Sequence, residues 1–316
     1  MSADIEQILK SVFSTMTGLP PGPLICRPVS GGSINDTYQV LTNSNKRWFC
    51  KFNDVRQFPD LFVKESRGLA LISQQQLIRV PETIACTQVD NTQVLVLEWI
   101  DQAPPTPEFW RRFGKSLALL HRLPQMPISP LTPASASTAP TPAPAPSQTP
   151  YFGLSDDNYM GALPQKNTPS PSWVDFFIQN RLEPQIHLAT QNGLLDDDAY
   201  RHFQRLYTFL PEIFPPEPPS LLHGDCWSGN FLCDTTGNPV LIDPAVYFGH
   251  RSVDLAMTTL FGGFDPIFYE AYAHYYPLPA NYREQWEISN LYPLLIHLNL
   301  FGLSYQRNIL HTIQRF

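Results

Sequence analysis

The sequence predicts an α+β fold with two lobes, in which a small antiparallel β-sheet with one helix precedes a larger, mainly helical part. The first hundred residues contain short segments of β-forming and alternating residues, whereas most later segments repeat apolar residues at helical spacing. The length of 316 residues also suits two lobes. We therefore expect an N-terminal lobe at residues 1–100 and a C-terminal lobe at residues 101–316.

The expected N-terminal sheet has five strands, and the pattern locates four of them. A loop with turn residues throughout, GGSIND at 31–36, joins the first two. The four segments lie at 24–30, 37–42, 47–53 and 92–100.

One helix is expected from about Pro59 to Ser73, and it places an acid on its apolar face. Glu65 shares that face with Phe62, Leu69 and Ile72. A buried carboxylate needs a partner, and Lys51 in the third strand is the candidate. The alternative is a solvated lysine on an edge strand and a glutamate at the margin of the apolar face.

The C-terminal part shows helical periodicity around two short apolar strands. An apolar stripe at 110–120 has His121 on the same face, which we interpret as a core histidine and not a ligand. Two apolar segments, SLLHGD and PVLIDP, are expected as strands. Further helices are expected at 172–185, 200–210, about 252–261 and from residue 282 onward.

Composition and charge argue against several kinds of partner. The net charge of −7 disfavours nucleic acid, because duplex binding usually requires a basic face. The first ten residues have no signal-peptide pattern, and no run of apolar residues is long enough for a membrane span. The five cysteines lack paired spacing, as is common in a reducing compartment. We expect a cytoplasmic protein that is a monomer or a weak dimer.

Proline is unusually frequent, with 33 residues, and many lie in one segment at about 124–150. This segment has no charge and almost no large apolar side chain, so it cannot bury enough surface to offset the entropy of ordering. We expect a disordered, tolerated insertion. A recognition motif for a proline-binding domain is the less favoured alternative.

The stretch LLHGDCWSGNFL contains the strongest chemical signal. Asp225 and Asn230 are five residues apart, and Asp243 ends an apolar strand 13 residues later. This spacing matches the catalytic-loop Asp, the catalytic-loop Asn and the Mg²⁺-binding Asp of protein kinases. A capped turn between two strands explains one loop, but it does not explain Lys51 and Glu65 earlier in the chain.

Phosphoryl transfer requires these residue types in these roles. Asp225 would orient the acceptor hydroxyl and take its proton, while Asn230 and Asp243 would supply oxygen ligands to Mg²⁺. Lys51 would hold the α- and β-phosphates of ATP, with Glu65 orienting it. The backbone N–H groups of Gly31, Gly32 and Ser33 would cover the phosphates, although GGSIND is not the usual glycine-rich motif.

These blocks, together with PVLIDPAVYFGHRSVDLAM and FGLSDDNYMGALPQKNTPSPSWVDFFIQNRL, resemble the fructosamine kinase (ketosamine kinase) family over nearly the whole chain. The resemblance implies a bilobal, protein-kinase-like enzyme. Such an enzyme uses ATP and Mg²⁺ to phosphorylate the sugar 3-hydroxyl of a small-molecule or protein-bound ketosamine, which leads to deglycation.

The resemblance also implies roles for individual residues. The backbone of Glu98, Trp99 and Ile100 would meet the adenine, and Asp254 would brace the catalytic loop. Trp227 would stack on the sugar-amine substrate, unless it is simply a core residue under the loop.

The chain departs from the family pattern at a few positions. Ser33 stands where a redox-linked Cys is frequent, and Cys226 stands where Leu is usual. A carboxylate beside Cys226 should raise the pKa of its thiol.

Two other functions stay open. One is a kinase of this fold that acts on another small amine or sugar alcohol, such as an aminoglycoside or choline. The other is a nucleotide-binding regulator without turnover, which is disfavoured because Lys51, Asp225 and the metal ligands are all present.

Overall fold

A computed structural model of the chain describes residues 3–17, 22–29, 34–42, 46–124 and 150–316. Within these residues, no helix has both the length and the apolar character needed to cross a lipid bilayer. Gly31, Gly32 and Ser33 lie outside the described residues, as do all but the end residues of the insertion expected at 124–150.

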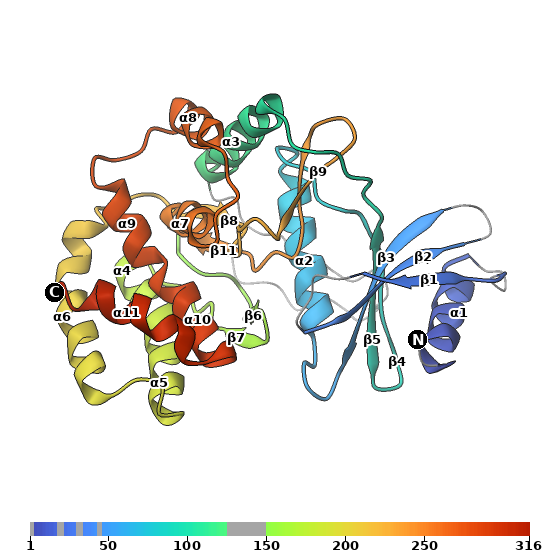
Figure 1. Ribbon diagram of the computed structural model, residues 1–316, viewed down its shortest axis with the longest axis horizontal. Coiled ribbons are helices and arrows are strands. Elements are labelled where there is room, and N and C mark those ends of the chain that lie inside the picture. Colours follow the sequence, from blue (N-terminus) through green and yellow to red (C-terminus); the bar gives the residue numbers. More distant parts are fainter. Residues whose placement is uncertain (1–2, 18–21, 30–33, 43–45, 125–149) are drawn as a thin grey trace, which may run out of the picture.

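The N-terminal part contains a five-stranded antiparallel sheet in the order β1-β2-β3-β5-β4, at the right of Figure 1. The predicted α+β class is therefore confirmed. The strands are β1 (Ile25–Pro28), β2 (Asp36–Leu41), β3 (Arg47–Asp54), β4 (Thr83–Val89) and β5 (Thr92–Glu98).

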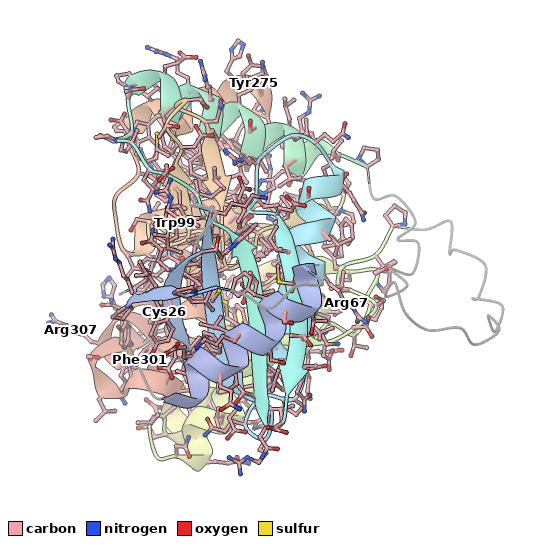
Figure 2. All side chains as sticks on the ribbon, turned by 90° about the vertical axis from the view of Figure 1, so that its right-hand side faces the viewer. Cys26, Arg67, Trp99, Tyr275, Phe301 and Arg307 are labelled. Atoms are coloured by element: carbon pink, nitrogen blue, oxygen red, sulfur yellow. The ribbon has the colours of Figure 1, made fainter. Side chains whose placement is uncertain are left out.

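Both faces of this sheet are buried, and the sequence of β5 reflects this burial. Val94 and Val96 pack against the N-terminal helix α1 (Ala3–Thr17), which lies across the strands in Figure 2. Leu95 and Leu97 belong instead to the core shared with α2 (Leu61–Gln74). A strand buried on both faces needs apolar residues at successive positions, which explains the run VLVL.

The register of the sheet directs Lys51 toward α2. Lys51 pairs with Leu95 across β3 and β5, and directly paired residues point to the same face. Its neighbour Phe52 packs on the opposite face, with Val94 and α1. Helix α2 lies between the sheet and the C-terminal part (Figure 1), so Lys51 faces the junction of the two lobes.

The C-terminal part is mainly helical, with three short strand pairs between the helices. The pairs are β6 (Asn158–Met160) with β7 (Leu163–Gln165), β8 (Ser220–Leu222) with β11 (Tyr247–Gly249), and β9 (Phe231–Cys233) with β10 (Pro239–Leu241). The helices are α3 (Pro107–Arg122), α4 (Trp173–Phe176), a π-helical segment (Phe177–Leu182), α5 (Glu183–Gln191), α6 (Asp197–Ile213), α7 (Ser252–Leu260), α8 (Pro266–Tyr275), α9 (Tyr282–Ser289), α10 (Leu291–Phe301), a 3₁₀ turn (Leu303–Tyr305) and α11 (Gln306–Ile313).

Several elements differ from the sequence-based expectation. Two helices, α1 and α2, pack on the sheet where one was expected, and α8 was not anticipated. Strand β4 is the one that the pattern did not locate. The helix expected at 172–185 is longer and contains the π-helical segment. The division of the chain at about residue 100 stays a prediction.

Candidate active site

Lys51 lies at the centre of a buried charge cluster. Its Nζ is 2.8 Å from Oε1 of Glu65 on α2 and 2.7 Å from Oδ1 of Asp243. The predicted contact between Lys51 and Glu65 is therefore present, and the solvated alternative is wrong, because Lys51 is only 2% exposed. Burial alone would lower the pKa of Lys51, but the two carboxylates outweigh burial and raise it. The ammonium is thus held charged and fixed in place.

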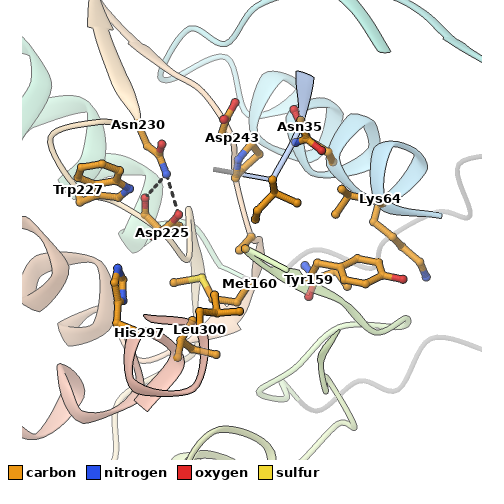
Figure 3. A pocket seen from close by; sticks show the side chains of 18 of the residues that line it. Asn35, Lys64, Tyr159, Met160, Asp225, Trp227, Asn230, Asp243, His297 and Leu300 are labelled. Atoms are coloured by element: carbon orange, nitrogen blue, oxygen red, sulfur yellow. Dashed lines mark hydrogen bonds between the residues drawn. The ribbon is translucent and has the colours of Figure 1, made fainter. Parts of the chain in front are cut away.

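The HGDCWSGN segment forms a tight loop between β8 and β9. The Asn230 side-chain amide donates to the backbone carbonyl of Asp225 at 2.9 Å and to its Oδ2 at 2.8 Å (Figure 3). The Asp225 carboxylate is thereby held in one orientation. Burial raises the pKa of Asp225 to about 7, although the bond from Asn230 acts in the opposite direction. A carboxylate with such a pKa can exchange a proton near neutral pH.

Asp254 in α7 fixes the start of this loop through hydrogen bonds to its backbone. Its carboxylate is fully buried and accepts the backbone N–H groups of His223 at 2.7 Å and Gly224 at 2.8 Å. The expected bracing role of Asp254 thus has a direct structural basis. His121 contacts Asp254 at 3.1 Å and the Tyr272 hydroxyl at 2.8 Å, which confirms it as a satisfied core histidine.

Gly224 is required at its position for two reasons. Its φ of +85° lies in the left-handed region, and a Cβ there would come within 2.1 Å of the Ala245 carbonyl oxygen. The close approach lets the loop stack on the segment that follows Asp243. Any larger residue would separate Asp225 from Asp243.

The oxygens of Asn230 and Asp243 are suited to a divalent cation. Both Asn230 hydrogen bonds use its amide nitrogen, which leaves Oδ1 available as a ligand. Asp243 has one oxygen on Lys51 and a side chain that is 43% exposed. The pocket brings the carboxylates of Glu65, Asp225 and Asp243 together with the ammonium groups of Lys51 and Lys64. The oxygens of Asp243 and Asn230 are of the kind that Mg²⁺ prefers.

These residues line one pocket between the lobes (Figure 3). The pocket also contains residues that the sequence analysis did not single out. They are Ile34, Asn35, Leu61, Lys64, Asn158, Tyr159, Met160, Gly161, Pro244, Ala245, Ile296, His297, Leu300 and Phe301. Several of them lie in segments that the sequence analysis quotes, such as GGSIND and FGLSDDNYMGALPQ, but no individual role was assigned to them.

Trp227 is half-buried and lines this pocket, so its ring is available to a ligand. A Cβ on Gly229 would lie 2.4 Å from the Trp227 indole, so a larger residue there would require the ring to move. Trp227 also packs against the main hydrophobic core, so its role toward a substrate stays a prediction.

Three residues expected to meet adenine, Glu98, Trp99 and Ile100, are not among the residues that line this pocket. Glu98, Trp99 and Ile100 are at the end of β5, where the Glu98 backbone N–H donates to Glu82 and its carboxylate contacts Arg79. The Trp99 indole donates to Asp101. Their role toward adenine stays a prediction.

Cys226 is a buried residue of the HGDCWSGN loop. Burial, together with the charges of Asp254 and Asp225, raises the pKa of its thiol well above the ordinary value. The thiol therefore stays protonated and acts as a small apolar side chain, as the sequence analysis expects.

The fold and the paired lysine, loop Asp and strand-end Asp define a phosphotransferase of protein-kinase-like architecture. A search for similar solved structures agrees. A fructosamine-3-kinase structure from Thermobifida fusca is 30% identical with a TM-score of 0.79, and each chain is covered to 97%. A choline kinase from Streptococcus pneumoniae is 14% identical with a TM-score of 0.60, over 99% of this chain and 100% of that chain, and shares the fold alone.

Sequence comparison gives the family. The fructosamine kinase family model matches residues 6–316. A protein from Synechocystis named as a ketoamine kinase is 36% identical over 95% of this chain and 93% of its own length. One with the same name from Enterococcus faecium is 35% identical, over 92% and 94%. The chain belongs to the fructosamine kinase family.

Proposed function

We propose that this protein is an ATP-dependent ketosamine kinase that phosphorylates the 3-hydroxyl of a sugar–amine adduct and so contributes to deglycation. The observation that carries the proposal is the shared pocket. A half-buried carboxylate with a pKa of about 7, Asp225, lines the same pocket as Lys51 and the two candidate metal ligands. The family membership supports the acceptor class.

In the proposed mechanism each residue acts at a defined point of the transfer. Asp225 accepts the proton of the attacking hydroxyl while the new O–P bond forms and the bond to ADP breaks. Lys51, oriented by Glu65, neutralises the α- and β-phosphates. Asn230 and Asp243 would hold Mg²⁺, which when bound supplies charge neutralisation for the phosphate oxygens.

Further contacts to ATP are proposed from the family pattern. The backbone of Glu98, Trp99 and Ile100 would meet the adenine, and the N–H groups of 31–33 would cover the phosphates. Trp227 would stack on the acceptor from the pocket wall.

A screen of acceptors tests the proposal. ATP consumption is measured with ribuloselysine, erythruloselysine and fructoselysine, and with an aminoglycoside and choline as comparators. We expect turnover with a ketosamine and loss of that turnover, with ATP binding retained, in Asp225→Asn. Turnover of the aminoglycoside or choline alone would contradict the proposal.

A further inference from the structure

A row of four aromatic rings runs along one side of the pocket, and three of them have no role in the proposed mechanism. Trp227 contacts Phe261 with ring centroids 5.5 Å apart, and Phe261 contacts His297 at 4.9 Å. Phe301 continues the row, 5.5 Å from His297. We call these four residues the aromatic wall. Trp227, His297 and Phe301 line the pocket, and Phe261 packs against Trp227 and His297. Phe261 and Phe301 are 40% and 52% exposed, so the aromatic wall presents apolar surface to solvent.

His297 differs from the other three rings because it carries polar nitrogens into the pocket lining. Its Nδ1 lies 2.7 Å from the backbone carbonyl of Pro293, one turn earlier in α10. A carbonyl can only accept, so Nδ1 carries the hydrogen. In the neutral ring Nε2 is then an acceptor, and it has no partner within the described residues. Burial lowers the pKa of His297, which favours this neutral form.

The position of His297 relates it to the acceptor and not to the nucleotide. Figure 3 shows His297 on the same side of the pocket as Trp227 and Asp225. A ketosamine bears its amine on carbon 1 and its reacting hydroxyl on carbon 3. When that hydroxyl is at Asp225, the amine must therefore lie within the same part of the pocket.

We propose that Nε2 of His297 accepts a hydrogen bond from the protonated amine of the acceptor, and that the aromatic wall packs against the carbon chain beyond that amine. This proposal rests on the proposed function. The subsite would select acceptors in which the amine of the adduct is a charged alkylamine. An ammonium donates and cannot accept, so a fixed acceptor suits it. Aromatic faces and the nearby Asp225 carboxylate favour the positive charge as well.

Two acceptor substrates that differ only at the amine show how much the amine contributes to kcat/KM. One is fructosyl-ε-lysine blocked at its α-amino group, and the other is the same compound acetylated on the ε-nitrogen, which removes both the charge and the N–H. His297→Phe keeps a ring against its neighbours but loses the acceptor, whereas His297→Gln keeps an acceptor oxygen near the position of Nε2. His274→Phe, at an exposed position on α8, is the matched control.

We expect wild type and His274→Phe to prefer the amine over the acetylated compound by roughly 10- to 100-fold in kcat/KM, as for a charged hydrogen bond. His297→Phe should lose most of this preference through a higher KM for the amine, and His297→Gln should retain most of it. If His297→Phe lowers Tm sharply, His297→Asn replaces it, because the Asn amide can still donate to the Pro293 carbonyl while its shorter side chain places no acceptor at the position of Nε2.

Two results would overturn the inference about His297 and leave the proposed function standing. One is a His297→Phe or His297→Asn enzyme that prefers the amine as strongly as wild type. The other is an equal loss on both acceptors, which would assign His297 to a sugar hydroxyl. If wild type turns over neither ketosamine, the proposed function fails and the subsite fails with it.

Discussion

Burial and hydrogen bonding have opposite effects on the pKa of Asp225. Burial raises its pKa to about 7, while the Asn230 amide stabilises the charged form. A base is most effective when its pKa is near the working pH, so this balance suits proton transfer at neutral pH. Asn230 thus has two proposed tasks, because its nitrogen orients Asp225 and its oxygen is free for a metal.

The raised pKa predicts the pH dependence of catalysis. Asp225 can accept a proton only when it is deprotonated, so kcat/KM should rise as pH increases through about 7. The measurement is kcat/KM for a ketosamine between about pH 5.5 and 8.5. A flat profile over the acidic half of this range would show that Asp225 does not titrate in the catalytic step.

The cluster around Lys51 predicts non-additive losses. Lys51→Met should reduce kcat/KM by orders of magnitude, because both positioning and charge at the phosphates are lost. Glu65→Gln should reduce it less, since Asp243 still holds the ammonium. The double variant should be little worse than Lys51→Met, because residues that act as a unit are not additive. Losses that simply multiply in the double variant would mean that Lys51 and Glu65 act independently.

Among the secondary-structure elements, the helices and strands with strong hydrophobic periodicity could be predicted from the sequence. Helix α2 and strands β2, β3 and β5 agree closely with the expected ranges. Helix α1 also had a signal, since Ile5, Leu9, Val12 and Phe13 follow helical spacing, but that segment was assessed only as a leader. Strand β4 is partly exposed along much of its length, so its residues lack the alternation that identifies a half-buried strand.

The contact of α3 with α8 depends on Gly114, which no local pattern marked. A Cβ at Gly114 would come within 2.2 Å of the Phe268 carbonyl oxygen and 2.9 Å of the Tyr272 nitrogen, both backbone atoms that cannot easily move. Gly114→Ala should therefore destabilise the fold by about 1–3 kcal/mol, as overpacking does. The measurement is Tm, with Arg111→Ala on the exposed face of α3 as control. Equal Tm values for both variants would contradict this packing.

At the scale of the molecule, the pocket combines residues far apart in the chain. That five residues would share one site could be predicted from the protein-kinase pattern, which places these residue types in a fixed order. They are Lys51, Glu65, Asp225, Asn230 and Asp243, and their roles stay proposals. The acceptor side could not be predicted, because residues such as Tyr159, Met160 and His297 meet only through the packing of the helical part. The lining of an acceptor pocket depends on tertiary contacts, and those leave no local motif.

The composition of the proline-rich segment predicts that its removal has little effect on the stability of the whole chain. Replacing about Ile128 to Ser147 by a short Gly/Ser link should leave Tm nearly unchanged, because the entropy of loop closure varies slowly with length. The residues at its two described ends, Pro124 and Pro150, are exposed. A fall in Tm of more than ~10 °C would mean that the segment packs on the lobes.

In the proposed reaction, Asp225 directs phosphate from ATP to the 3-hydroxyl of a ketosamine. The NMR spectrum of the product formed from fructoselysine, ATP and Mg²⁺ by wild type and by Asp225→Asn tests this role. We expect phosphorus–proton coupling at carbon 3 with wild type and no phosphorylated sugar with Asp225→Asn. Phosphate on another hydroxyl, or the same product at a similar rate from Asp225→Asn, would contradict this expectation.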